Sequence, residues 1–119
     1  MKKLIIIEDD TDAREMSVFT FENNGYDVVQ SATALSVDEI SAQQPHVVVI
    51  GYMVNGKPGN DLCVKLKANE RTANIPLILY SATQNVDTIS RGSVADGFIA
   101  KPLQLEDFVY LVHRLAYQN

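Results

Sequence analysis

The sequence has only one cysteine, and it has no apolar segment long enough to cross a membrane. A single cysteine excludes an intramolecular disulfide, and the position of Cys63 between Leu62 and Val64 in a helical pattern indicates a small buried hydrophobe. A spanning helix needs roughly 20 apolar residues, and the run at 4–7 is also too short for a signal peptide. We therefore expect a cytoplasmic protein without membrane contact.

Positive charge is also scarce: 10 lysines and arginines stand against 15 aspartates and glutamates, for a formal net charge of −5. Nucleic-acid binding depends on clustered Lys and Arg, so we expect a protein partner and no nucleic acid. The two histidines, His46 and His113, show no metal-ligand spacing to each other or to Cys63. No Ser-His-Asp pattern or nucleophile elbow is visible in a suitable context, so we expect no enzyme activity.

Five short apolar runs alternate with helical patterns along the 119 residues. The runs predict strands at 4–7, 26–31, 47–50, 77–80 and 97–100. Each pair of parallel strands needs a right-handed crossover, so this alternation predicts an α/β fold, a three-layer sandwich around a five-stranded parallel sheet. The length suits one domain over 1–119, with no output domain.

Capping and turn signals predict the helix boundaries. The stretch 12–15 is similar to a capping box and predicts a first helix that ends before Gly25. A clearer capping box, from Ser36 to Glu39, starts a brief second helix, and Asn60 caps a third. We expect a loop at 52–59, a short or frayed fourth helix at 85–93, and a strongly periodic last helix at 105–115.

Acidic, hydroxyl and basic side chains follow three of the predicted strands. They are Glu8, Asp9 and Asp10 after the first strand, Ser81 after the fourth, and Lys101-Pro102 after the fifth. The carboxyl ends of parallel strands open on one crevice, where open α/β folds place ligands and chemistry. The central strand brings no acid to this crevice, because it ends in Gly51.

Taken in this order, these features resemble the receiver domain of bacterial response regulators, the phospho-accepting module of two-component signalling. The resemblance covers the whole chain and implies the flavodoxin-like receiver fold with strand order 2-1-3-4-5. It implies a metal pocket at Glu8 and Asp9. The other residues that it places in the crevice are Asp10, Met53, Ser81 and Lys101, and it makes Phe98 the switch aromatic of the interaction face.

The chain departs from the family at the position that receives phosphate. In the family, an aspartate at the end of the third strand takes phosphate from a histidine kinase, assisted by a divalent metal; here that residue is Gly51. Glycine has no side chain to carry an acyl phosphate, so the family reaction cannot occur there. Glu8 and Asp9 should then bind Mg²⁺ only weakly, no cofactor is required, and Lys101 should bridge to one of the two acids.

Plainer interpretations of these residues stay open. The acids at 8–10 would serve as a solvated strand end and as helix N-terminal charges, Ser81 would bond its own backbone, and Phe98 would be a core aromatic. Gly51 is either an engineered substitution or a position that another group approaches closely. Other departures favour a natural origin; for example, Asn55 stands where the family often has proline.

Three functions are compatible with this pattern. The first is an atypical response regulator module, a pseudo-receiver, that works in phosphorelay signal transduction through protein contact without phosphorylation. A signalling protein or histidine kinase would dock on the face formed by the fourth helix, the fifth strand and the last helix, and the chain would be a monomer or weak dimer. The alternatives are phosphorylation at Asp9, Asp10 or Ser81, and a flavodoxin-like domain that binds a small ligand.

Overall fold

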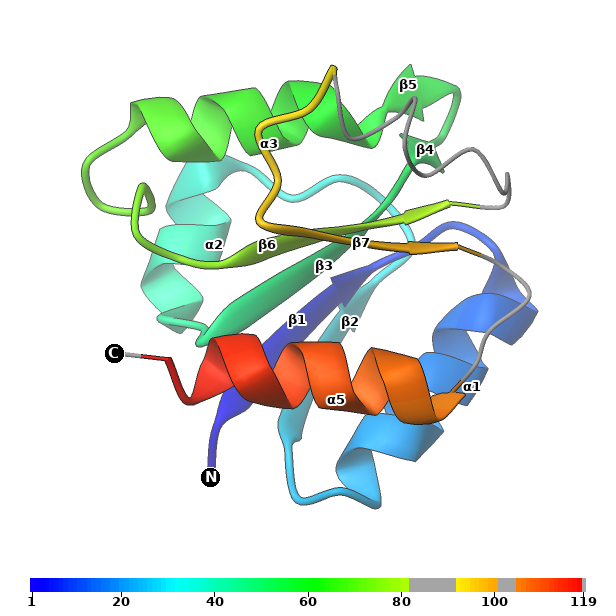
Figure 1. The fold of residues 1–119 in the computed structure, drawn as a ribbon. Helices are drawn as coiled ribbons and strands as arrows, with labels where there is room; N and C mark the ends of the chain where they lie inside the picture. The colour runs from blue at the N-terminus through cyan, green and yellow to red at the C-terminus, as the bar shows by residue number, and fades with distance from the viewer. Residues whose placement is uncertain (82–91, 101–104, 119) are drawn as a thin grey trace.

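A computed structural model describes residues 1–81, 92–100 and 105–118. Five strands form one parallel sheet in the order β2-β1-β3-β6-β7. The strands are β1 (Lys3–Ile7), β2 (Asp27–Ser31), β3 (Val47–Gly51), β6 (Leu77–Ser81) and β7 (Gly97–Ala100). The described helices are α1 (Thr11–Glu22), α2 (Val37–Gln43), α3 (Gly59–Ala68) and α5 (Leu105–Ala116). Figure 1 shows α1 and α5 on one face of the sheet and α2 and α3 on the other.

This arrangement confirms the predicted three-layer sandwich and the predicted strand order, with β6 and β7 as the fourth and fifth strands of the sheet. The most buried apolar runs form the three inner strands, β1, β3 and β6, and helices cover both faces of this parallel sheet. In β1, Leu4 and Ile6 pack toward α1 and α5, whereas Ile5 and Ile7 pack toward α2 and α3. Among the described residues, none of the helices has the length and apolar character that crossing a bilayer requires.

The first helix begins differently from the prediction. Asp10, and not the stretch at 12–15, provides the cap: its carboxylate accepts hydrogen bonds from the backbone N–H groups of Asp12 (3.0 Å) and Ala13 (3.2 Å). Asp10 has an extended backbone, as an N-cap residue requires, whereas Asp12 already lies in the first turn. The capping box of Ser36 and Glu39 at the start of α2 is confirmed.

The segment predicted as a loop at 52–59 contains a short hairpin of β4 (Met53–Val54) and β5 (Lys57–Pro58). Asn55 and Gly56 form its turn with φ angles of 51° and 78°, the positive values that a two-residue hairpin turn needs. The prediction that Asn60 caps α3 is wrong, because Pro58 occupies the cap position and no side chain caps it. The expected fourth helix at 85–93 falls mostly outside the described residues.

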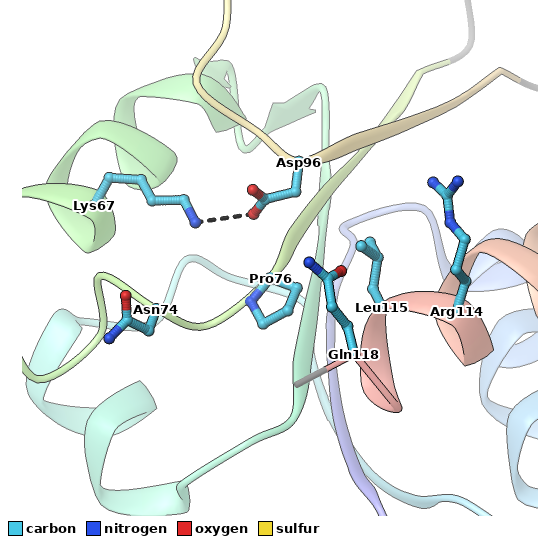
Figure 2. Close-up of a pocket in the computed structure, with 7 residues that line it drawn as sticks. All are labelled: Lys67, Asn74, Pro76, Asp96, Arg114, Leu115 and Gln118. Atoms are coloured by element: carbon cyan, nitrogen blue, oxygen red, sulfur yellow. Dashed lines mark hydrogen bonds and ion pairs between the residues drawn. The ribbon is translucent and has the colours of Figure 1, made fainter.

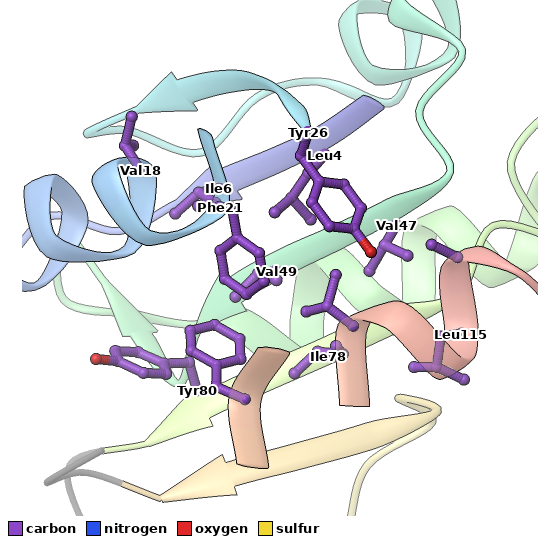
Figure 3. Packing of buried hydrophobic residues seen from close by; sticks show 13 residues of the cluster. Leu4, Ile6, Val18, Phe21, Tyr26, Val47, Val49, Ile78, Tyr80 and Leu115 are labelled. Carbon is purple, nitrogen blue, oxygen red and sulfur yellow. The ribbon is translucent and has the colours of Figure 1, made fainter. Parts of the chain in front are cut away.

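An aromatic group closes the core on the side of α1 and α5, shown in Figure 3. The rings of Phe21 and Phe108 meet edge to face with centroids 4.9 Å apart, and Tyr80 stacks on Phe108 at 5.5 Å. Tyr80 is the penultimate residue of β6, so this packing fixes the carboxyl end of that strand. The next residue, Ser81, therefore has a defined position where the carboxyl ends of the strands lie.

Candidate functional site

The carboxyl ends of β1, β3 and β6 lie side by side. Ile7 pairs with Ile50, and Gly51 pairs with Tyr80. The ladder continues past β1, because the backbone N–H of Glu8 donates to the carbonyl of Ser31 at 3.0 Å. The pairing of Ile7 with Ile50 and the approach of the Glu8 carboxylate to position 51 place Glu8 and Gly51 at the same edge of the sheet.

The space beside Gly51 is narrow. A Cβ atom on this residue would lie 3.2 Å from Oε2 of Glu8 and 3.3 Å from Cγ2 of Val54. Glu8 is buried, with 4% of its surface exposed, and its Oε2 also accepts a 3.3 Å hydrogen bond from the backbone N–H of Asp10. The carboxylate of Glu8 and the methyl group of Val54 thus border the place where a side chain at position 51 would begin.

Asp9 engages the hairpin. Its Oδ2 accepts a 2.7 Å hydrogen bond from the backbone N–H of Asn55, at the tip of the turn between β4 and β5. The guanidinium of Arg14 supports the same loop from the other side, since its Nη1 donates to the carbonyl oxygen of Glu8 at 2.8 Å. Residues 8–10, which we call the acidic loop, are therefore joined by hydrogen bonds to α1 and to the hairpin.

Ser81 and Tyr80 are buried at the end of β6, with 3% and 4% of their surfaces exposed. Burial raises the pKa of Tyr80 from 10.0 to about 12; the negative charge of Glu8 acts in the same direction, and a hydrogen bond with Ser17 opposes it. The Tyr80 hydroxyl is thus a neutral group close to the acidic loop. Ser81 pairs with Ala100 of β7, and both are the last residues of their strands.

The remaining predicted residues lie as follows. The side chain of Met53 is 45% exposed, whereas its carbonyl oxygen would lie 3.4 Å from a Cβ on Gly51. Phe98 is partly buried and packs against the core on the side of α2 and α3. Lys101 and its predicted bridge to Glu8 or Asp9 lie outside the described residues. The structure therefore brings Glu8, Gly51 and the Met53 carbonyl together.

The family implies a divalent metal, and the oxygens at this crevice are of the type that Mg²⁺ prefers. The available donors are the carboxylates of Glu8 and Asp9 and the carbonyl of Met53. Within the described part of the chain, no group of three or more His, Cys, Asp or Glu residues could hold a metal ion. The donor types fit a magnesium ion, and one oxygen of Asp9 already accepts a hydrogen bond from Asn55.

Both histidines and the cysteine have structural roles. The Nδ1 atom of His46 accepts a hydrogen bond from the backbone N–H of Lys3 at 2.9 Å. The Nδ1 atom of His113 lies 2.9 Å from the hydroxyl oxygen of Tyr26. Cys63 is fully buried, as predicted, and burial raises the pKa of its thiol from 9.0 to about 12. A thiol with such a pKa is unreactive at neutral pH.

A polar pocket of about 620 Å³ lies at the opposite end of the sheet (Figure 2). There, Nζ of Lys67 lies 2.8 Å from Oδ2 of Asp96 and also donates to the carbonyls of Ala73 and Ile75. The same Asp96 oxygen accepts from the backbone N–H of Leu77 at 2.8 Å. These contacts join α3 to the amino ends of β6 and β7, so the lysine holds the fold together away from the crevice.

Two polar residues of the crevice region were missed by the sequence reasoning. Asn55 was identified only as a turn residue, and Asn60 was expected to cap α3. In the structure, Asn55 is the hydrogen-bond partner of Asp9, and the Asn60 side chain contacts residues 92–94 across the molecule. The Asn55-Gly56 pair predicted the turn itself, but no signal in the sequence indicates which distant group each asparagine meets.

Comparisons with known proteins agree with this geometry. Residues 4–113 match the family model of the response regulator receiver domain. The chain is 29% identical over 118 residues to the DNA-binding dual master transcriptional regulator RpaA of Synechocystis, covering 97% of this chain and 49% of that protein. It is 30% identical over 115 residues to the phosphate regulon transcriptional regulatory protein PhoB of Pseudomonas aeruginosa, covering 91% and 48%. The chain thus spans about half the length of these curated relatives.

Solved structures show the same fold. The receiver domain of a sensor histidine kinase from Pseudomonas aeruginosa, with a magnesium ion coordinated in its active-site cleft, superposes with a TM-score of 0.87 at 16% identity, covering 98% of both chains. The receiver domain of a DNA-binding response regulator from Colwellia psychrerythraea gives 0.85 at 24% identity, covering 99% of this chain and all of that one. On the match of its sequence and the likeness of its fold, this chain belongs to the response regulator receiver domain family.

Proposed function

We propose that this chain is a pseudo-receiver: a signalling module of two-component systems that acts through protein contact and takes no phosphate. The observation that carries the proposal is Gly51, which stands at the carboxyl end of the central strand, where the family's phospho-acceptor is expected. Aspartyl-phosphate chemistry needs a carboxylate nucleophile, and glycine supplies none. We place no catalytic residue in the crevice, and we propose that the module is not an enzyme.

The surroundings of Gly51 support this proposal. Oε2 of Glu8 would lie 3.2 Å from a Cβ atom at position 51, which is tighter than an ordinary van der Waals contact. A neighbouring buried carboxylate would also repel a second one, because two like charges in a site of low dielectric disfavour each other. The crevice therefore accommodates glycine more easily than it would accommodate aspartate.

We propose that Mg²⁺ binds weakly at Glu8 and Asp9 and is not required. Magnesium sites in proteins usually combine one or two carboxylates with phosphate oxygens of the substrate. Without the acceptor, no phosphate completes the coordination, and Asp9 must share its carboxylate with the N–H of Asn55. Lys101 would complete the charge balance by bridging to one of the two acids.

We propose a protein as the partner, either a signalling protein or a histidine kinase, which would dock on the face formed by the fourth helix, β7 and α5. The net charge of −5 favours a protein over a nucleic acid as the direct partner. Phe98, on β7, is partly buried and joins this face to the core. The chain would act in the cytoplasm as a monomer or weak dimer, and any output would pass through another region or another protein.

The test is incubation with acetyl phosphate and Mg²⁺ followed by intact mass spectrometry. We expect the mass of the unmodified chain, while a receiver domain that carries the acceptor aspartate gains one phosphoryl group under the same conditions. One added phosphoryl group on this chain would overturn the proposal. Peptide mapping would then decide whether Asp9, Asp10 or Ser81 carries it, which is the second function considered from the sequence.

A ligand-binding role in a flavodoxin-like domain makes a different prediction. It requires a small molecule that raises the thermal midpoint in a saturable manner or that co-purifies with the chain. The residues after β1 are acidic and contain no glycine-rich loop, so we expect no such stabilisation by nucleotides or flavins. A saturable shift with one of these ligands would favour that role over the pseudo-receiver.

A further inference from the structure

Residues 53–60, which we call the bridge, lie between two sets of hydrogen bonds. The bridge comprises the hairpin of β4 and β5 and the first two residues of α3. At one end, Asn55 binds the acidic loop after β1; at the other end, Asn60 binds the segment 92–94 that leads into β7. The two ends therefore contact parts of the chain that are far apart in sequence.

The contact at the acidic loop is a charge-assisted hydrogen bond. The backbone N–H of Asn55 donates to Oδ2 of Asp9 at 2.7 Å, a short distance typical of a bond to an ionised acceptor. Asn55 has a positive φ of 51°, and the turn that requires this angle directs its N–H toward Asp9. Any change at the Asp9 carboxylate therefore acts directly on the tip of the hairpin.

The contact at the other end uses the whole side-chain amide of Asn60. Its Nδ2 donates to the carbonyl of Gly92 at 3.1 Å, and its Oδ1 accepts from Oγ of Ser93 (2.6 Å) and from the backbone N–H of Val94 (3.3 Å). Oγ of Ser93 in turn accepts from the N–H of Ala95 at 3.1 Å. This network determines where the chain enters β7.

The bridge between these contacts is held close to the central strand. A Cβ on Gly59 would lie 2.1 Å from the carbonyl oxygen of Gly51, so only glycine allows this approach. The N–H of Gly59 also donates to the carbonyl of Tyr52 at 2.7 Å. Residues 55–58 are exposed, but Val54 and Gly59 on either side of them are buried, so the paired hairpin connects its tip at Asn55 to the start of α3 between two fixed positions.

We propose that the bridge couples the acidic loop to the entry of β7, with Asn60 as the positioning residue. A change at Asp9, including the arrival of a divalent cation, would shift the hairpin and, through Asn60, the segment 92–94. This inference rests on the proposed function, because it supplies the route by which the acidic crevice influences the partner face without phosphorylation.

The experiment is a double-mutant cycle read by amide hydrogen exchange. The proteins are the wild type, Asp9→Ala, Asn60→Ala and the double variant. The reporter is the backbone N–H of Asp96, the residue before β7, which donates to the carbonyl of Leu77. We expect Asp9→Ala to speed exchange at Asp96 by about fivefold or more in the wild-type background and to have no further effect in the Asn60→Ala background.

Coupling is reciprocal, so Asn60→Ala should speed exchange of the Asn55 N–H by a similar factor. Asn24→Ala is the matched control: Asn24 is exposed, and its side chain donates to the carbonyl of Thr20 in the preceding helix α1, so both reporters should keep their rates. The N–H of Val48, bonded to Pro76, serves as the reference for global unfolding. If Asn60→Ala also lowers the exchange protection of Val48, Ser93→Ala replaces it in the cycle; this variant removes the two bonds that Ser93 Oγ makes with Asn60 and Ala95.

Additive effects of Asp9→Ala and Asn60→Ala on the Asp96 reporter would overturn the coupling. That result would leave the proposed function intact, because the absence of phosphoryl transfer is measured independently by mass. Conversely, a phosphoryl group found on the chain would overturn the pseudo-receiver assignment while the exchange cycle could still show coupling. The two failures are therefore distinguishable.

Discussion

The backbone N–H of Asn55 and the Oδ2 of Asp9 form a 2.7 Å hydrogen bond that joins the loop after the first strand to the hairpin after the central strand. A proline at position 55 would have no N–H to donate. The contact therefore requires a residue other than proline at this position.

Replacing Asp9 by alanine removes the acceptor of this bond. Hydrogen bonds to charged groups contribute roughly 1.5–3 kcal/mol, and the exposure of this pair reduces the expected loss of unfolding free energy to about 1 kcal/mol. Urea titration measures the loss, and Asp27→Ala, at an exposed aspartate of the edge strand β2, is the control. Equal midpoints for Asp9→Ala and the wild type would show that the bond does not stabilise the fold.

Introducing the missing acid, Gly51→Asp, should destabilise the domain. The new Cβ would press on Glu8 and Val54, and overpacking of this kind typically costs about 1–3 kcal/mol. The second carboxylate adds repulsion that a divalent cation relieves, so Mg²⁺ should raise the thermal midpoint of this variant more than that of the wild type. Gly51→Ala, which adds only the Cβ, separates the steric effect from the charge; equal responses of all three proteins to Mg²⁺ would contradict the prediction.

Stability should fall at alkaline pH through the buried tyrosines. Burial raises the folded-state pKa of both Tyr26 and Tyr80 from 10.0 to about 12. The unfolded chain then loses these protons first, so the stabilisation is complete below pH 10 and is lost as the pH rises from about 10 to about 12. Tyr80→Phe should lose less stability over this interval, with the exposed Tyr110→Phe as control. An unchanged slope in Tyr80→Phe would refute the assignment.

Cys63 should resist thiol reagents in the native protein. Its side chain is fully buried and its pKa is raised to about 12, so both access and thiolate formation are blocked at neutral pH. We expect a colorimetric disulfide reagent to label one thiol per chain in urea. Under native conditions, the labelled fraction over the same time should be less than about a tenth of that. Rapid labelling of the native chain would indicate that α3 opens far more often than its packing implies.

Much of the fold could be predicted because the local sequence carries it. The runs at 4–7 and 47–50 are continuously apolar, and only a strand buried on both faces uses such a run. The capping box of Ser36 and Glu39 is confirmed. It could be predicted because both partners lie within one turn of the helix that they start. The prediction that Glu8 lies at the same sheet edge as Gly51 likewise followed from parallel strands that end on one edge.

The failures have a common physical cause. Asp12 and Asn60 were assigned to caps because capping residue types stand near both helix starts, but each helix begins earlier than its pattern suggests. The side chain of Asn60 then finds its partners at Gly92, Ser93 and Val94, more than thirty residues away. Contacts at that separation depend on how the layers pack, which a local pattern does not record.

By itself, the amino-acid sequence determined the alternating strands and helices, the burial of Cys63 and the absence of a carboxylate at position 51, because each depends on the identity of a residue or on a period along the chain. Only the tertiary structure decided that Glu8 lies against the space at Gly51, that Asn55 binds Asp9 and that Asn60 connects α3 to the entry of β7. Those contacts join segments that the chain brings together only after the sheet has formed, so their partners are set by packing in three dimensions.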